Sequence, residues 1–215
     1  MPYVIVFNHL PRTAGLTLTT LLATWRHVTL DYQSDDSEHA RNSWLARPLH
    51  LDQLAPGSAL VGHYTGAGRL SARYPHIFDD ARFRLVTFLR DPWATALSAL
   101  GSSAGQHLLA ARAPAEAAMS LAGAFAKALD VPPLAPREAL ARYWFVGLTE
   151  RLETSMQLLA RRLGHAAPEA MLTHNARTAQ VGLPEQAPSS FRAAARDDYA
   201  LYDIARARLE QEAAE

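Results

Sequence analysis

The sequence predicts an α/β domain in which helices flank a central parallel sheet. Short apolar runs rich in β-branched and aromatic residues recur along the chain, and each leads toward a stretch with helical periodicity. This alternation is typical of a parallel sheet that is covered on both faces. We expect the four clearest strands at 3–8, 59–62, 83–89 and 143–148.

Composition restricts both the architecture and the partners. The 215 residues are 49% hydrophobic, so we expect 1–215 to form a single domain with a substantial core. The formal charge of +0 argues against a nucleic-acid partner, and the lack of cysteine excludes disulfides and thiolate metal sites. No apolar run approaches the ~20 residues that cross a bilayer, and the N-terminus shows no export signal. We therefore expect a cytoplasmic protein without a membrane partner.

The first strand leads into a turn that suits an anion. Apolar residues 3–7 are followed by a polar turn and then by helical periodicity. Backbone N–H groups at a helix N-terminus attract phosphate, and Gly15 would let the backbone approach one closely. Arg12 and the hydroxyls of Thr13 and Thr17 add donors at the same place. An ordinary buried strand and turn with a solvent-facing arginine is the alternative.

A candidate general base follows the strand expected at 59–62. His63 lies just past the strand end, where α/β folds open their ligand crevice. A histidine pKa near 6.5 suits the removal of a proton from a hydroxyl at neutral pH. The chain has nine histidines, so a purely structural role is the alternative, and His9 is the second choice as base.

A second candidate phosphate site follows the strand expected at 83–89. Asp91 is a good helix N-cap and Pro92 suits the first helical position, so we expect a helix to begin here. Arg90 would present a bidentate fork to phosphate, and Ser98, eight residues later, would supply a hydroxyl donor. A surface salt bridge between Arg90 and an acid such as Asp91 is the alternative.

The remaining segments carry structural signals. We expect a short strand at 27–30 and helices at 108–129, 149–163 and 191–215. Pro114 is expected to start a new helix that ends at Pro132, and Gly164 is expected to stop the helix before it.

Four segments resemble those of a known family. Residues 9–18, HLPRTAGLTL, resemble the 5′-phosphosulfate loop of sulfotransferases that use 3′-phosphoadenosine 5′-phosphosulfate (PAPS), usually Pro-Lys-Thr-Gly-Gly-Thr-Ser. Arg12, Ala14 and Leu16 stand where that family often has lysine, glycine and threonine. Residues 86–92 with Ser98 resemble its 3′-phosphate segment, and 145–155, FVGLTERLETS, resemble its Val-Gly-Leu-Thr-Glu-Arg-Leu segment. The Gly-His pair at His63 is similar to the base segment of carbohydrate 2-O-sulfotransferases and their bacterial relatives.

The resemblance implies a three-layer, P-loop-like sulfotransferase fold and sulfuryl transfer from PAPS to an acceptor hydroxyl, without a metal. The acceptor would be a small molecule or a saccharide, and a homodimer is left open. The resemblance implies His63 as general base and Arg12 as a group that offsets charge on the leaving nucleotide. Nucleotide-binding residues would be Arg12, Thr13, Ala14, Gly15, Leu16, Thr17, Arg90, Ser98 and, in a later loop, Arg177.

Two other functions remain open at the level of sequence. A P-loop small-molecule kinase is disfavoured because the turn lacks the Gly-Lys-Ser/Thr of the Walker motif. A catalytically inactive nucleotide-binding homologue is compatible with the departures at Arg12 and Leu16.

Overall fold

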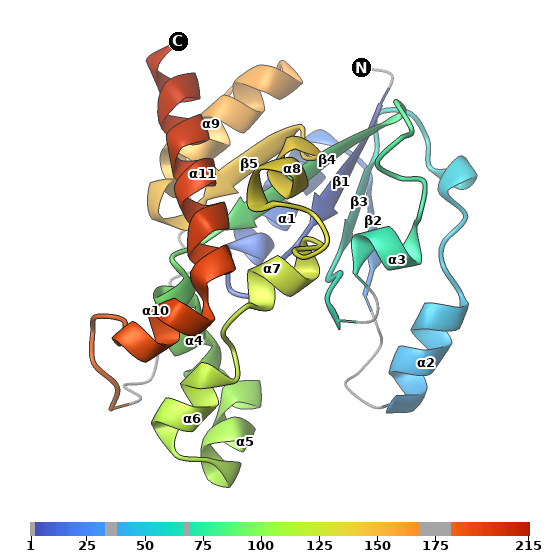
Figure 1. The fold of residues 1–215 in the computed structure, drawn as a ribbon. Coiled ribbons are helices and arrows are strands. Elements are labelled where there is room, and N and C mark those ends of the chain that lie inside the picture. The colour runs from blue at the N-terminus through green and yellow to red at the C-terminus, as the bar shows by residue number, and fades with distance from the viewer. Residues whose placement is uncertain (1–2, 33–37, 67–68, 168–181) are drawn as a thin grey trace.

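The computed structural model describes residues 3–32, 38–66, 69–167 and 182–215 and has an α/β architecture (Figure 1). Five parallel strands form one sheet in the order β2-β3-β1-β4-β5. The strands are β1 (Val4–Asn8), β2 (Val28–Asp31), β3 (Ala59–Gly62), β4 (Phe83–Leu89) and β5 (Phe145–Leu148). The expected α/β class and central parallel sheet are confirmed.

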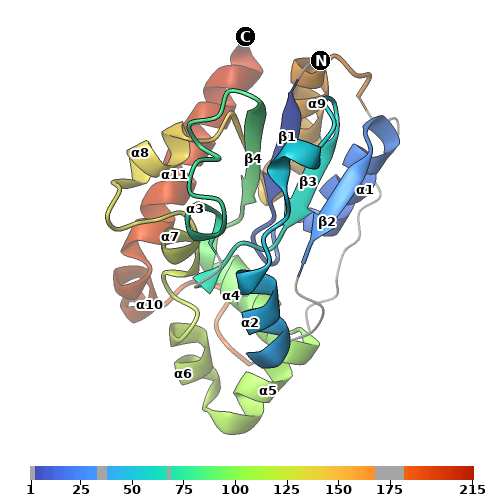
Figure 2. The same ribbon diagram turned by 90° about the vertical axis from the view of Figure 1, so that its right-hand side faces the viewer.

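Helices cover both faces of this sheet. In Figure 2, which views the sheet from its side, α1 and α9 lie on one face, while α3, α7, α8 and α11 lie on the other. The helices are α1 (Gly15–Trp25), α2 (Glu38–Ala46), α3 (Leu70–Arg73), α4 (Pro92–Leu100), α5 (Ser103–Ala111), α6 (Pro114–Met119), α7 (Ala124–Ala128), α8 (Pro136–Ala141), α9 (Leu152–Leu163), α10 (Ser189–Ala194) and α11 (Arg196–Ala214). Within the described ranges, no helix has the length and apolar character needed to cross a membrane.

The strands are buried because they lie between these two helical layers. Every residue of β1, β3 and β5 is buried, as is expected for strands covered on both faces. β5 begins at Phe145, two residues later than the sequence indicated, and residues 142–144 connect it to α8, which ends at Ala141. The strand expected at 27–30 is present as β2.

Local sequence signals explain most helix boundaries. The Asp91 carboxylate accepts the Ala94 N–H at 2.8 Å and Pro92 is the first residue of α4, as expected. The Ala-rich stretch differs from expectation, because the helix that begins at Pro114 does not continue to Pro132. Gly123, with φ of 77°, turns the chain and separates α6 from α7.

Helices α4, α5, α6 and α10 project beyond the carboxyl ends of the strands (Figure 1). A second hydrophobic cluster joins three of them. Trp93 of α4 and Phe191 of α10 contact each other at 4.8 Å between ring centroids, and Ala117 and Ala118 of α6 belong to the same cluster. This cluster anchors a helical wall beside the edge of the sheet where ligands bind in α/β proteins.

A buried ion pair between Asp31 and Arg73 stabilises the same edge of the sheet at β2. The Asp31 carboxylate, at the end of β2, accepts hydrogen bonds from Arg73 Nη2 at 2.7 Å, Tyr74 Oη at 2.7 Å and Trp44 Nε1 at 2.8 Å. Burial acts to raise the pKa of Asp31, but these hydrogen bonds outweigh it and hold the pKa below its ordinary value. The pair therefore ties α2 and α3 to the sheet.

Loss of one partner of this pair should be costly, because it leaves a buried guanidinium without its counter-ion. Asp31→Asn is expected to lower the free energy of unfolding by roughly 3–5 kcal/mol in urea denaturation. The matched control is Asp80→Asn, which removes the exposed pair with Arg82, and it should have a far smaller effect. Equal effects of the two substitutions would contradict the structural role of Asp31.

Candidate functional site

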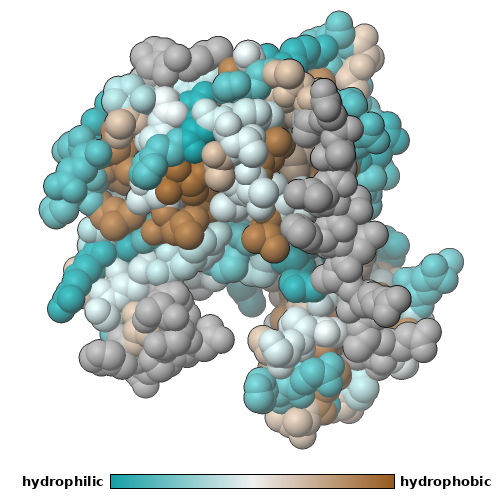
Figure 3. All heavy atoms as spheres, turned by 180° about the vertical axis from the view of Figure 1, so that it is seen from behind, coloured by the Kyte–Doolittle hydropathy of each residue, from teal (hydrophilic) through white to brown (hydrophobic). Residues whose placement is uncertain are grey.

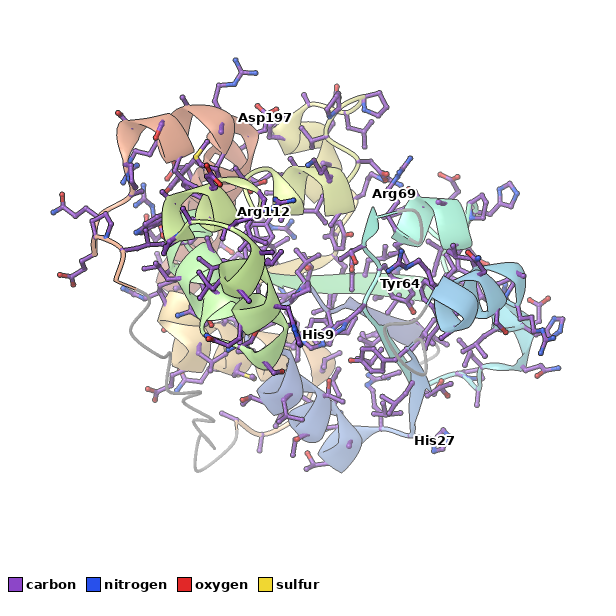
Figure 4. The ribbon with its side chains drawn as sticks, turned by 90° about the horizontal axis from the view of Figure 1, so that it is seen from below. His9, His27, Tyr64, Arg69, Arg112 and Asp197 are labelled. Carbon is purple, nitrogen blue, oxygen red and sulfur yellow. The ribbon has the colours of Figure 1, made fainter. Side chains whose placement is uncertain are left out.

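The candidate site lies at the carboxyl ends of the three central strands. β1 lies between β3 and β4, with Asn8 opposite both Gly62 and Thr87, so the residues that follow these strands gather at one edge. His9 follows β1, His63 follows β3 and Arg90 follows β4. Figure 4 looks onto this edge and shows His9 near the middle of the molecule, close to the start of α1. Ligands of open α/β sheets bind outside such strand ends.

The turn between β1 and α1 has a backbone suited to an anion. Arg12 and Ala14 have φ of 68° and 62°, and they are two of the three non-glycine residues with positive φ in the described chain. Left-handed backbone costs about 1–2 kcal/mol per residue outside glycine, and such strain concentrates at ligand sites. Ala14 gives α1 no side-chain cap, and the first turn holds no acidic residue. Alternating backbone of this kind directs N–H groups into a concave anion site.

Gly15 allows a close approach between the start of α1 and the residue that follows β1. A Cβ atom at Gly15 would lie 1.6 Å from Nε2 of His9, so a larger residue would displace the imidazole. The close approach at Gly15 is therefore made by the His9 ring. Glycine at this position brings the end of β1 into contact with the start of α1.

The first turn and the end of β4 are in direct contact. Arg12 Nε donates to Ser98 Oγ at 2.9 Å, and Arg90 Nη1 makes a long hydrogen bond of 3.4 Å to the Arg12 carbonyl oxygen. Ser98 is buried, and Arg12 and Arg90 are half-buried. The structure thus brings together three of the residues that the sequence indicated as phosphate-binding.

The positive charges of Arg12 and Arg90 are not neutralised by ion pairs. In the described residues, neither Arg12 nor Arg90 forms an ion pair. Burial lowers the pKa of Arg90; the charge of Arg12 adds to this effect, and Glu150 opposes it. Glu150 itself accepts the Asp91 N–H at 2.9 Å. The pair therefore consists of two half-buried cations that form no ion pair, with Glu150 and Asp91 acting on Arg90 as acidic neighbours. Such an arrangement is compatible with an anionic ligand.

The side chains of His63, His9 and Tyr32 lie within hydrogen-bond distance of one another in series. His63 Nε2 lies 2.8 Å from His9 Nδ1, which also lies 3.1 Å from the Tyr32 hydroxyl. His63 is exposed, and partial burial of its ring lowers its pKa, whereas deeper burial together with the neighbouring His63 lowers the pKa of His9 to about 3. Both rings are therefore neutral at pH 7. Because the His9 ring lies against Gly15, these hydrogen-bonded rings connect His63 to the turn after β1.

The other predicted residues of the turn occupy different environments. Thr13 is buried and donates its hydroxyl proton to the Leu10 carbonyl oxygen at 2.7 Å, so its side chain serves the turn itself. Leu16 is 63% exposed at the start of α1, and Thr17 is buried. Arg177 lies outside the described residues.

A cavity of about 330 Å³ lies next to Arg12, and the sequence did not predict it. The turn after β1, helix α4 and the segment from α6 to α7 form its walls. Viewed from behind, the molecule is hollowed below the sheet, beside the lobe that contains α5 and α6 (Figure 3). The walls of the cavity come from segments that are distant in sequence, so no local pattern could have revealed the cavity. In the described residues, no group of three or more His, Asp or Glu side chains is arranged to hold a metal ion.

A scan against protein-family models and a search of the curated proteins both found no match to this chain. The site geometry and the sequence motifs are therefore the basis for any functional proposal.

Acid should destabilise the fold through His9. The unfolded chain gains a proton near pH 6.5, whereas folded His9 does so only near pH 3, so the free energy of unfolding should fall as the pH drops through this window. His9→Gln removes this group and should give a shallower dependence of stability on pH between 7 and 4 than the wild type, measured by urea denaturation. An unchanged slope would show that His9 is not held neutral in the fold.

Proposed function

We propose that this protein transfers a sulfuryl group from PAPS to an acceptor hydroxyl. The observation that carries the proposal is the contact between the anion-binding turn and the end of β4. Residues 78 apart in sequence, Arg12 and Arg90, lie together at the carboxyl edge of the sheet. The resemblance assigned these two segments to opposite ends of one nucleotide, and their adjacency supports that assignment.

In this proposal the 5′-phosphosulfate binds the N–H groups of the turn and the start of α1, with Arg12 beside it. The 3′-phosphate binds Arg90 and Ser98. The Ser98 hydroxyl accepts from Arg12, and its own proton remains available to a phosphate oxygen. Arginine is suited to this role because its planar fork matches two phosphate oxygens at once.

The proposed reaction is an in-line displacement at sulfur. A bond forms between the acceptor oxygen and sulfur as the bond from sulfur to the 5′-phosphate oxygen breaks, and 3′-phosphoadenosine 5′-phosphate leaves. By analogy with phosphoryl transfer, the protein acts mainly through positioning and charge stabilisation. Arg12 would offset the negative charge that develops on the bridging oxygen.

His63 is the proposed acceptor of the hydroxyl proton. Its lowered pKa keeps the imidazole neutral at pH 7, so it can take a proton without first losing one. In this proposal the Nε2–H of His63 donates to His9 Nδ1, which leaves the unprotonated Nδ1 of His63 for the acceptor. His9 and Tyr32 are proposed to fix this orientation, as hydrogen-bonded partners do for other catalytic histidines.

A P-loop kinase and an inactive homologue are the alternatives. The single lysine of the chain, Lys127, lies in α7 and not in the turn, where a P-loop kinase needs one. Thermal-shift measurements with ATP and with 3′-phosphoadenosine 5′-phosphate distinguish a kinase from the proposed sulfotransferase. If the proposal holds, only 3′-phosphoadenosine 5′-phosphate should stabilise the protein strongly. A direct assay of sulfate transfer distinguishes an active enzyme from an inactive nucleotide-binding homologue.

Removal of the Arg90 side chain should weaken nucleotide binding. Arg90→Ala is expected to lower the affinity for 3′-phosphoadenosine 5′-phosphate by roughly 10- to 100-fold in calorimetry, because a charge-assisted contact of about 1.5–3 kcal/mol is lost. Arg112→Ala, an exposed arginine at the end of α5, is the control and should bind as the wild type does. Equal affinities of the Arg90 variant and the wild type would remove the 3′-phosphate assignment.

Removal of the proposed base should affect turnover and not nucleotide binding. His63→Ala is expected to lower kcat by roughly 10²- to 10⁴-fold in a sulfate-transfer assay. Its affinity for 3′-phosphoadenosine 5′-phosphate should match that of the wild type, because His63 is assigned no contact with the phosphates. A fully active variant would eliminate His63 as the base.

A further inference from the structure

The cavity next to Arg12 is apolar over most of its wall. It is enclosed by the turn after β1, by one face of α4 and by the segment from α6 to α7. Its apolar lining includes Leu10, Pro92, Ala96, Leu121, Ala122 and Phe125. A volume of about 330 Å³ lies at the lower end of the range for small-molecule sites, roughly 300–1,000 Å³. Its size therefore suits a compact ligand.

Three polar groups in this wall already form hydrogen bonds within the protein, and the two hydroxyls among them are left to a ligand as acceptors only. The Thr95 hydroxyl donates to the Asp91 carbonyl oxygen at 2.9 Å, and the Ser120 hydroxyl donates to the Ala117 carbonyl oxygen at 2.7 Å. Asp198 is buried and accepts the Ala126 N–H of α7 at 2.8 Å. A ligand that carried many hydroxyl groups would leave most of them without partners, at a cost of about 1–3 kcal/mol each.

The remaining polar groups of the wall come mainly from the turn after β1 and from the segment that follows β3. Arg12 lines the cavity, and so does Thr65, two residues after His63. A ligand with its apolar body between α4 and α7 would therefore place a polar end toward Arg12 and the end of β3. Besides Arg12, two charged side chains line the cavity: the exposed Lys127 and the buried Asp198.

We propose that this cavity binds the sulfate acceptor, and that the acceptor is a compact apolar molecule with a single hydroxyl group rather than a saccharide. This inference rests on the proposed function and narrows it, because the sequence left both acceptor classes open. The mostly apolar wall and its engaged polar groups favour an apolar acceptor over a saccharide, because a saccharide needs several free hydrogen-bonding partners.

The test compares the binding of 2-naphthol and methyl glucoside to the full chain by calorimetry, with 3′-phosphoadenosine 5′-phosphate present. Ala99→Phe narrows the cavity from α4, and Ala122→Phe narrows it from the opposite wall. Ala94→Phe is the matched control, because Ala94 is also half-buried on α4 but does not line the cavity. Far-ultraviolet circular dichroism and urea denaturation, measured for each variant, report independently of nucleotide binding whether the variant folds.

We expect 2-naphthol to bind the wild type and Ala94→Phe, to bind both cavity variants at least tenfold more weakly, and to be sulfated by the wild type. Methyl glucoside should show no binding. Preferential binding or sulfation of methyl glucoside would overturn the acceptor class, and so would unchanged 2-naphthol affinity in the two cavity variants. If 2-naphthol binding depends on the cavity but no nucleotide binds, the cavity assignment stands and the proposed sulfotransferase activity falls.

Discussion

The rest of the site depends on the contact between the turn after β1 and the end of β4. Arg90 donates to the backbone of Arg12, and the Arg12 side chain donates to Ser98 of α4. These bonds hold two guanidinium groups of like charge close together, and neither has an ion-pair partner within the described chain. A bound anion would relieve this repulsion, which is why we propose a ligand with several negative charges for this site.

The sheet order places these residues together. β1 is central, with β3 on one side and β4 on the other, so each of its two neighbours delivers a functional side chain to the same edge. The buried Asp31–Arg73 pair fixes α2 and α3 on the β2 side, and the cluster around Trp93 and Phe191 fixes the helical wall on the other. The proposed nucleotide site and the cavity therefore lie between two separately anchored parts of the fold.

Local patterns were sufficient to predict the strands, the turn and the start of α4, because burial on both faces and helix capping leave direct marks in sequence. They were not sufficient for α2, nor for the break at Gly123, where a long Ala-rich stretch has high helix propensity along its whole length. The contact between Gly15 and His9 and the cavity beside Arg12 depend on long-range packing. The eight-residue spacing between Arg90 and Ser98 suggested that both bind a phosphate, which stays a prediction, and it gave no sign of the hydrogen bond from Arg12 to Ser98.

The central claim is that one nucleotide spans the turn and the end of β4, and a crystal structure with 3′-phosphoadenosine 5′-phosphate tests it most directly. The account predicts the 5′-phosphate on the backbone N–H groups around Gly15 and the 3′-phosphate within hydrogen-bond distance of Arg90 and Ser98. A nucleotide bound elsewhere, or one whose 3′-phosphate points away from Arg90 into solvent, would contradict it.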